Sequence, residues 1–312
     1  MPLVSVIICT IRRLEVFLPL VQSLRAQSYP HLEVLVVGRD GEPAPDLPSE
    51  GPVQVRFLGA PKGLAAARNV GISRAQGDYI IFLDDDVSIP PDFVRDAVKI
   101  LELPEHRTTG GLTAYDRRNY NTPVPARWKL RKLLGITPSL VPGDSNHLGR
   151  SVTLAFLQPF SGCREVKWLP GFCQIFRREA IEGLRYDEKM IVEDRDFSMD
   201  VGLSWRLIVS GDLHLEHHMS SEARHAHAFQ TWRAAFGLGR SYAKRRRSAA
   251  DVLAAVHVAT GELVIDVLVL AAQPKLYNGK VAWSRLKGFV EGYLSWRSER
   301  VRPLQARSAG AQ

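Results

Sequence analysis

Residues 62–87, KGLAAARNVGISRAQGDYIIFLDDDV, carry the strongest structural signal in the chain. Residues 64–74 are rich in small and apolar side chains and predict a helix, and residues 79–83 form an apolar run of strand length. Three consecutive aspartates, at positions 84–86, follow the predicted strand directly. The stretch therefore predicts a helix and a buried strand, with a cluster of negative charge where the strand ends.

The three aspartates predict a cation site. Successive carboxylates repel one another, so a loop that follows a buried strand tolerates them only with a cation or hydrogen-bond donors nearby. In an extended segment Asp84 and Asp86 lie on one side and Asp85 on the other. Two convergent carboxylates suit Mg²⁺ or Mn²⁺, and we prefer this interpretation to an acidic surface turn.

Strand and helix patterns alternate on both sides of this stretch. The predicted strands are Leu3–Cys9, Leu32–Val37, Val53–Leu58, Tyr79–Leu83, Val166–Leu169, Cys173–Arg177, Trp205–Val209 and Leu213–His217. The predicted helices are Glu15–Ala26, Leu64–Arg74, Asp92–Leu103, Ala126–Leu134, Arg178–Gly183 and Glu193–Leu203. Residues 104–165 contain several Pro and Gly, so we expect mainly loops there. The alternation predicts an α/β fold with a mixed, mostly parallel sheet flanked by helices, in which ligands bind at the carboxyl ends of the strands.

The composition is that of a globular protein. The chain has 312 residues, 45% of them hydrophobic, enough for one large domain with an appendage or two modest domains. Three cysteines without a CxxC spacing disfavour a disulfide scaffold or a structural zinc site. The apolar start lacks a basic region and a small-residue cleavage site, so we expect a buried strand, no signal peptide and a cytoplasmic location.

The excess of positive charge lies in the last part of the chain. Residues 1–223 hold 26 basic and 28 acidic residues, whereas residues 224–312 hold 15 and 5. From residue 225 onwards the pattern is helical. This asymmetry indicates an anionic partner for the C-terminal region. We expect membrane lipid and not nucleic acid, because no nucleic-acid-reading motif is present.

Two C-terminal segments bear on a membrane. Lys280–Arg302 places aromatic and apolar residues at helical spacing among basic residues, which suits an anionic membrane surface as well as it suits packing against the rest of the protein. Val252–Ala272 is strongly apolar but contains Glu262 and Asp266. A carboxylate near a bilayer centre costs about 2.5–3.5 kcal/mol, so we expect a packed helix and not a spanning one.

Two further groups carry candidate chemistry. Lys62–Asn69 opens a helix, whose N-terminus and Arg68 can face a diphosphate. Glu193, Asp194 and Asp196 open another helix, where the helix dipole favours carboxylates; one of them is also a candidate general base.

Three histidines follow a strand pattern near residue 217. Alternation places His214 and His218 on one face and His217 on the other. One imidazole can complete a metal site, and the alternative is a set of partly exposed histidines.

Five blocks, taken together, resemble the family 2 glycosyltransferases. They are VSVIICTIRR near the start, LEVLVV at 32–37, residues 62–87, WLPGFCQIFRREAI at 168–181, and EDRDFSMDVGLSWRLIVSGDLHLEHH at 193–218. The blocks occur in the family's order over about residues 3–218, and the block at 62–87 is the most specific. The resemblance implies the GT-A fold and a nucleotide-sugar donor.

The resemblance also implies residue roles. Asp194 is the expected catalytic base, with Glu193 beside it, and Asp86 is the expected metal ligand, joined by Asp84 and His217. The remaining implied site residues are Thr10, Arg12, Asp40, Arg68, Asp84 and Asp85 for the donor and nucleotide, and Trp168, Gly171 and Arg178 on the acceptor side. Gly38 stands where the family often has an aspartate that touches the base, so Arg39 and Asp40 are the candidates to replace it.

The function expected from residues and resemblance is glycosyl transfer. We expect an inverting hexosyl- or deoxyhexosyltransferase of cell-envelope polysaccharide synthesis that uses Mg²⁺ or Mn²⁺ and a glycan, lipid-linked or small-molecule acceptor. The expected domains are a catalytic domain at 1–223, with a nucleotide-sugar half at 1–110 and an acceptor half at 111–223, and a basic helical region at 224–312. For this region we consider two alternatives, a peripheral position on the inner membrane face and packing on the catalytic domain. The alternatives are an inactive nucleotide-sugar-binding or scaffold protein and a nucleotidyltransferase.

Overall fold

The computed structural model describes residues 1–10, 14–41, 53–218, 227–272 and 279–297. Its residues group into two compact units, Met1–Arg224 and His225–Gln312, called here the N-terminal unit and the C-terminal unit. Each unit is described separately below.

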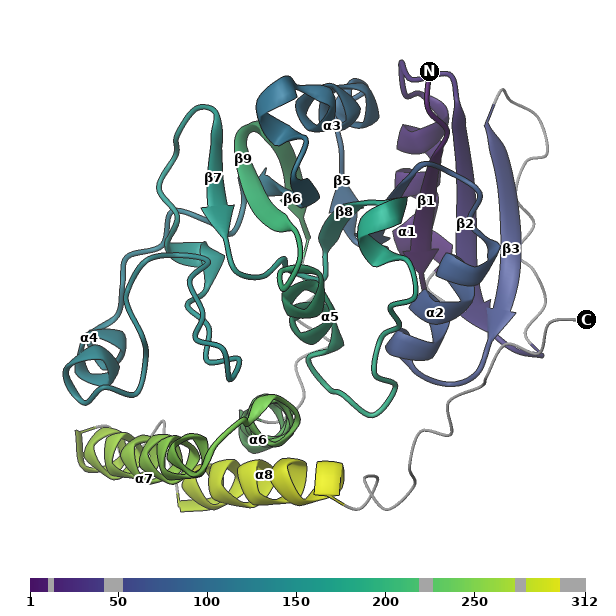
Figure 1. The fold of residues 1–312 in the computed structure, drawn as a ribbon. Helices are drawn as coiled ribbons and strands as arrows, with labels where there is room; N and C mark the ends of the chain where they lie inside the picture. Colours follow the sequence, from purple (N-terminus) through teal and green to yellow (C-terminus); the bar gives the residue numbers. More distant parts are fainter. Residues whose placement is uncertain (11–13, 42–52, 219–226, 273–278, 298–312) are drawn as a thin grey trace, which may run out of the picture. The chain divides into compact units, whose positions relative to one another are not determined.

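The elements alternate between strands and helices in the first part of the chain and are helical in the last (Figure 1). The strands are β1 (Val4–Cys9), β2 (Leu32–Arg39), β3 (Gln54–Ala60), β4 (Tyr79–Asp84), β5 (Val87–Ser88), β6 (Thr109–Asp116), β7 (Cys163–Val166), β8 (Cys173–Arg177) and β9 (Arg206–His217). The α-helices are α1 (Leu14–Arg25), α2 (Leu64–Arg74), α3 (Phe93–Glu102), α4 (Ala126–Leu133), α5 (Glu193–Val201), α6 (His227–Arg245), α7 (Ala249–Ala272) and α8 (Gly279–Arg297). Short 3₁₀ helices lie at Pro104–His106, Leu154–Phe156 and Arg178–Ile181.

The strands of the N-terminal unit form one mixed sheet, as predicted. Among the described residues the order is β3-β2-β1-β4-β8-β6-β9-β5, and β7 pairs with β9. The strands β3, β2, β1 and β4 are parallel to one another, whereas β8 runs antiparallel to both β4 and β6. In this register Cys9 lies beside both Val37 and Asp84, so three parallel strands end at one edge of the sheet.

Apolar side chains cover both faces of the sheet. Alternate residues of β1 point to opposite sides, so Val6 belongs to one core and Ile7 to the other. The first core is closed by α1 and α3, and the second by α2 and α5. Small residues of α2, among them Ala65 and Ala67, let this helix pack closely on the sheet. The sequence reasoning that placed helices on both faces is confirmed.

Residues 104–165 are mainly loops, as predicted, but the structure adds a strand that the sequence reasoning missed. β6 (Thr109–Asp116) lies inside this segment, and all eight of its residues are buried. Gly110 and Gly111 hid the strand from the pattern, because glycine is uncommon in strand interiors. The reason for glycine is packing: a Cβ on Gly111 would lie 2.7 Å from Leu207 Cδ2 and 2.9 Å from Leu169 Cδ1.

Other elements match their predictions less closely. The strand predicted at Val166–Leu169 lies earlier, as β7, and the two strands predicted at Trp205–Val209 and Leu213–His217 are one strand, β9. β9 stays continuous because a register shift against β6 absorbs the irregular residues between the two predicted runs. The helices at 64–74 and 126–133 and the strand at 173–177 confirm their predictions.

The C-terminal unit contains α6, α7 and α8 among its described residues. The aromatic stripe predicted on residues 280–302 is used partly inside the unit: Phe289 is 8% exposed and its ring lies 5.8 Å from the ring of Tyr242. Trp283, Val290 and Leu294 on the same helix are exposed. The basic residues predicted at 300 and 302 lie outside the described residues.

The tight packing of β6 generates a prediction. Gly111→Ala should lower the free energy of unfolding by about 1–3 kcal/mol, because its methyl group overlaps Leu207 and Leu169. The measurement is urea unfolding followed by tryptophan fluorescence. In a Leu207→Ala background the same change should cost less, since the clashing Cδ2 is gone; an equal cost in both backgrounds would contradict this packing.

Candidate active site

A cleft of about 400 Å³ opens at the edge where β1, β2 and β4 end. Its lining comes from the ends of these strands, the start of α2 and the end of β9: Cys9, Thr10, Val37, Gly38, Arg39, Pro61, Lys62, Gly63, Leu64, Ala67, Asp84, Asp85, Asp86 and His217. The start of α2 brings backbone N–H groups and the positive end of the helix dipole to the cleft, an arrangement that favours an anion such as a phosphate.

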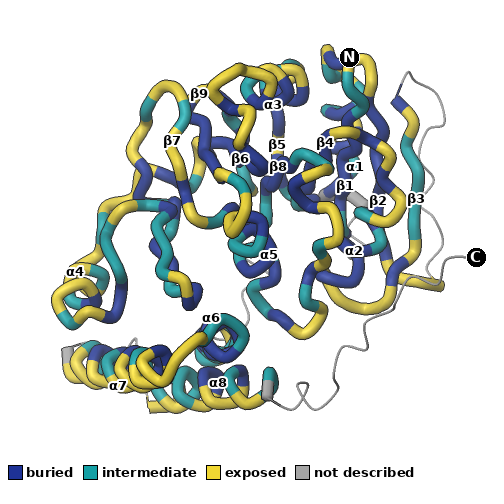
Figure 2. The backbone as a smooth tube through the Cα atoms, viewed as in Figure 1, coloured by how far each residue is buried: buried dark blue, intermediate teal, exposed yellow. Residues whose placement is uncertain are grey.

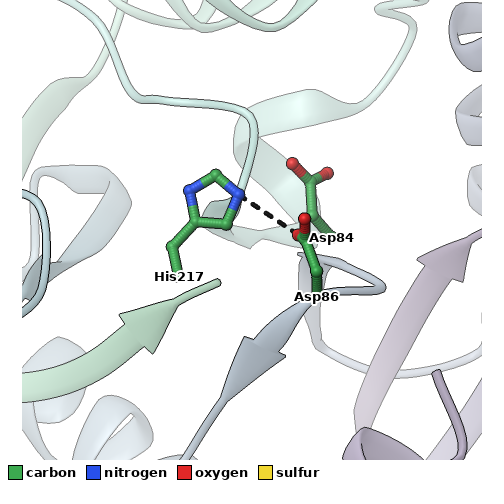
Figure 3. A group of neighbouring side chains, drawn as sticks. All are labelled: Asp84, Asp86 and His217. Carbon is green, nitrogen blue, oxygen red and sulfur yellow. Dashed lines mark ion pairs between the residues drawn. The ribbon is translucent and has the colours of Figure 1, made fainter. Parts of the chain in front are cut away.

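Asp84, Asp86 and His217 converge in this cleft (Figure 3). The candidate ligand atoms, one from each side chain, lie within 4.8 Å of one another. His217 Nε2 is 3.1 Å from Asp86 Oδ1. Burial lowers the pKa of His217, but the hydrogen bond and charge of Asp86, together with Asp84, outweigh it and raise the pKa above its usual range. The donor set, two carboxylates and one imidazole, fits a divalent cation such as Mn²⁺.

A buried network holds His217 in place. Asp116, at the end of β6, is fully buried and accepts hydrogen bonds from the backbone N–H groups of Arg118 and His217. The Asn119 amide donates to Asp116 Oδ2 at 2.7 Å and to the His217 carbonyl at 2.8 Å. The ring of Phe172 packs on the His217 imidazole with the centroids 4.9 Å apart. β6 and β9 therefore present the imidazole from a rigid support.

Arg68, on α2, is buried to 2% exposure and connects several segments. Its guanidinium donates to Glu193 Oε1 at 2.8 Å, to the Gly171 carbonyl at 3.2 Å and to Asp84 Oδ1 at 3.4 Å. The guanidinium carbon lies 5.3 Å from the centre of the Tyr186 ring. Burial alone would lower the pKa of Arg68, but these partners raise it, so the side chain is a fixed positive charge beside the cleft.

The carboxylates near Arg68 share a crowded site. Burial raises the pKa of Glu193 to about 7, although Arg68 opposes this and Asp194 adds to it. Desolvation likewise raises the pKa of Asp84, against the opposing charges of Arg68 and His217. Glu193 is the buried ion-pair partner of Arg68, because its Oε1 accepts from the guanidinium at 2.8 Å.

Asp194 lies next to Glu193 at the start of α5 and meets the loop before β8. A Cβ on Gly171 would lie 3.0 Å from both Arg68 Nη2 and Asp194 Oδ2, so only glycine lets the two charged groups approach this backbone. Gln174 donates to the Asp194 carbonyl at 2.9 Å and accepts from the Tyr186 hydroxyl at 2.7 Å. These contacts position Asp194 relative to Arg68.

The predicted donor residues differ in their position relative to the cleft. Thr10 and Asp85 line the cleft, but their side chains bond each other at 2.8 Å, and Asp85 is 4% exposed. Asp40 is exposed and outside the cleft lining, whereas Arg39 is part of it. Arg12 lies outside the described residues.

The predicted acceptor residues also separate. Gly171 lies at the cleft end of the sheet, and the Trp168 indole donates to the Val152 carbonyl at 3.3 Å. Arg178 is at the opposite end, where its Nε donates to the Gly77 carbonyl at 2.6 Å. The cause is the antiparallel pairing of β8 with β4, which carries Arg178 away from the aspartates.

The remaining histidines point to other partners. The His214 ring lies 6.2 Å from the Tyr115 ring, and His218 Nε2 is 2.9 Å from Ser88 Oγ. The residue pattern alone had left open which of the three histidines joins the aspartates and the resemblance implied His217, which is the one that lies beside Asp84 and Asp86.

Several residues of the site carried no signal in the sequence. Phe172, Asn119, Asp116, Gln174 and Tyr186 hold the side chains described above, yet they come from loops and strands that are distant along the chain. A local pattern cannot report such contacts. Among these five, Phe172 directly follows Gly171, a residue for which the resemblance implied a role.

The raised pKa of Glu193 predicts the pH dependence of stability. Its pKa lies above its usual value of 4.5 in the folded state, so the folded protein binds this proton more tightly than the unfolded chain does. The free energy of unfolding should therefore fall as the pH rises from about 4.5 to about 7. Glu193→Gln should flatten this slope in urea titrations across the same range; an unchanged slope would contradict the assignment.

Comparisons with known proteins agree with this geometry. The model of the glycosyl transferase family 2 matches residues 5–185, more than half of the chain. The uncharacterized glycosyltransferase YwdF of Bacillus subtilis is 29% identical over 131 residues, which are 41% of this chain and 48% of that protein. The succinoglycan biosynthesis protein ExoM of Rhizobium meliloti is 32% identical over 132 residues, which are 39% of this chain and 40% of that protein. The matched segments thus cover less than half the length of each relative.

Solved structures extend the likeness in fold. The mannosyltransferase PcManGT of Pyrobaculum calidifontis, solved with GDP-Man and Mn²⁺, superposes with a TM-score of 0.55 at 18% identity and covers 95% of this chain and 87% of its own. TarS residues 1–349 of S. aureus, solved with UDP-GlcNAc, gives a TM-score of 0.51 at 15% identity and covers 95% of this chain and 92% of its own. At such identities the likeness concerns the fold, which is the predicted GT-A fold. The chain belongs to glycosyl transferase family 2.

Proposed function

We propose that this protein transfers a sugar from a nucleoside-diphosphate sugar to a hydroxyl group, in one displacement that inverts the anomeric carbon. The observation that carries the proposal is the convergence of Asp84, Asp86 and His217 in a cleft that also receives the N-terminus of α2. The negative charge of a diphosphate is stabilised by cationic groups and backbone N–H groups, and by a metal ion held by protein ligands beside them.

The chain's own residues supply the steps. The acceptor hydroxyl oxygen attacks C1 of the sugar, its proton passes to a carboxylate oxygen of Asp194, and the bond from C1 to the diphosphate oxygen breaks. Arg68 lies close to Asp84 and Asp194, so its positive charge can stabilise negative charge that develops on the reacting groups between these two carboxylates. Glu193 keeps Arg68 in place and so acts as a positioning residue.

A divalent cation would be held by Asp86, Asp84 and His217. When bound, it would supply Lewis-acid stabilisation of the departing diphosphate. Mn²⁺ accepts both carboxylate and imidazole ligands, and PcManGT was solved with this ion. Mg²⁺ prefers oxygen ligands and is the second candidate.

The substrates are proposed by class. The donor is a nucleoside-diphosphate hexose or deoxyhexose; similar structures were solved with GDP-Man and UDP-GlcNAc. The acceptor is a glycan or a lipid-linked sugar, and ExoM, a succinoglycan biosynthesis protein, supports a role in polysaccharide synthesis. Residues 1–110 would bind the donor and residues 111–223 the acceptor.

Donor binding tests the metal site. In a thermal-shift screen of nucleoside diphosphates and their sugars, at least one should stabilise the protein, and Mn²⁺ or Mg²⁺ should increase the shift. Asp86→Asn should lose the metal-dependent part of the shift because a ligand charge is removed. Asp92→Asn, at a half-exposed carboxylate outside the cleft, is the matched control and should leave it unchanged. A complete screen without any metal-dependent shift would refute the proposed donor site.

Turnover tests the base. Asp194→Asn should lower kcat by about 10²–10⁴-fold, because the amide cannot take the hydroxyl proton, while the donor Kd stays within a factor of about two. Asp200→Asn, at the other end of α5, should keep its activity. Release of free sugar and nucleoside diphosphate by the wild type is the assay that needs no known acceptor. Near-normal release and transfer by Asp194→Asn would exclude Asp194 as the base, and a wild type that binds donors but never releases sugar would favour a binding protein.

A further inference from the structure

Helix α7 has its charged and apolar residues on unexpected sides. The buried side contains three carboxylates, Asp251, Glu262 and Asp266, with exposures of 8%, 3% and 2%. The exposed side is mostly apolar: beside His257 and Thr260 it carries Val252, Leu253, Val256, Leu263, Val264, Val267 and Leu268, with exposures from 38% to 71%. We call these seven residues the outer face of α7. A helix of a water-soluble bundle has the reverse arrangement, with the apolar side inward.

The carboxylates are satisfied inside the C-terminal unit. Asp266 Oδ2 accepts from Arg285 Nε at 2.7 Å, and Glu262 Oε2 lies 3.6 Å from Arg285 Nη1. Asp251 accepts from the backbone N–H groups of Arg247 and Ser248 at the start of the helix. Their negative charge is therefore directed away from the outer face. Glu262 and Asp266 argued against a membrane-spanning helix, and their inward position does not oppose lipid contact on the outer face.

Helices α6 and α8 form a firm support for α7. Backbone meets backbone between them: a Cβ on Gly292 would lie 2.0 Å from the Phe236 carbonyl, and one on Gly288 would lie 2.4 Å from the Trp232 carbonyl. Such close approach through glycine makes a rigid helix pair. The outer face is exposed along the length of α7 (Figure 2).

The C-terminal unit that carries the outer face is basic. Residues 244–247, Lys-Arg-Arg-Arg, directly precede α7, and Arg247 is exposed. Lys280 and Lys287 are exposed on α8. The C-terminal region holds 15 basic and 5 acidic residues, and three of those five are the inward carboxylates of α7. An apolar helical face in a strongly basic unit complements a bilayer that contains anionic lipid.

We propose that the outer face of α7 docks on the surface of an anionic membrane, with the helix lying in the plane of the interface. The helix has 24 residues and is about 36 Å long, and Ala249–Ala271 meets the length and hydropathy criteria for a span, with a mean hydropathy of 2.0. Docking in the plane fits better than crossing, because the neighbouring α8 exposes Lys287 and Glu291 near its middle and cannot follow α7 into hydrocarbon. The proposal moves the membrane contact from the predicted 280–302 segment to α7 and is independent of the glycosyl transfer.

Vesicle flotation of the purified full-length protein tests the proposal. Vesicles of phosphatidylcholine, with and without phosphatidylglycerol, should bind the wild type, more strongly when the anionic lipid is present and less so at high salt. Leu253→Glu/Leu268→Glu should lower the bound fraction at least about tenfold. Leu133→Glu/Leu203→Glu is the matched control, because it adds the same two charges at exposed leucines of the N-terminal unit, and it should bind like the wild type. Circular dichroism of both variants checks that the helices remain.

Each other outcome overturns part or all of the proposal. A wild type that does not float with either vesicle, or an α7 variant that floats as well as the control, refutes membrane docking by this face. A wild type that does not float but is a dimer, which Leu253→Glu/Leu268→Glu converts to a monomer, assigns the face to a second copy of the chain. Equal binding to both vesicles refutes the role of the basic flank.

Discussion

The buried guanidinium of Arg68 is the interaction on which the site depends. It joins α2 to Asp84 at the end of β4, to the Gly171 loop before β8 and to Glu193 at the start of α5. A buried charge is tolerated only when it is paired, and removing one partner of such a pair typically costs about 3–5 kcal/mol. Arg68 therefore joins segments from the early and late parts of the N-terminal unit at the candidate active site.

Sheet topology places the other groups around this charge. β1, β2 and β4 are parallel and end together, so the three aspartates and Thr10 reach one edge. β9 approaches from the far side of the sheet and ends at the same edge, where Asp116 and Asn119 hold His217. The candidate metal ligands thus come from the end of β4, the turn after it and the end of β9, which are far apart along the chain.

The C-terminal unit differs in where its apolar and charged residues lie. In the N-terminal unit apolar side chains fill both faces of the sheet, whereas α7 keeps its carboxylates inside, two of them with Arg285, and exposes its apolar residues. Water penalises the exposed face, and a lipid interface would not. The proposed membrane contact would give the exposed apolar residues of α7 a favourable environment.

The sequence by itself determined the elements that have a clear period and boundary: α2 at 64–74, β4 ending in three aspartates, and β8 at 173–177. The residue pattern also singled out Asp84, Asp86, Arg68 and the acidic group that opens α5, because charge at strand and helix ends has a local reason, and the family resemblance added Gly171 and the role of Asp194. Only the tertiary structure decided that β6 is a strand, that Arg68 and Glu193 are buried partners, that Arg178 lies away from the cleft and that α7 faces outward. Each of these depends on what a residue touches across the fold, and contacts between residues far apart in the chain leave no periodic trace along it.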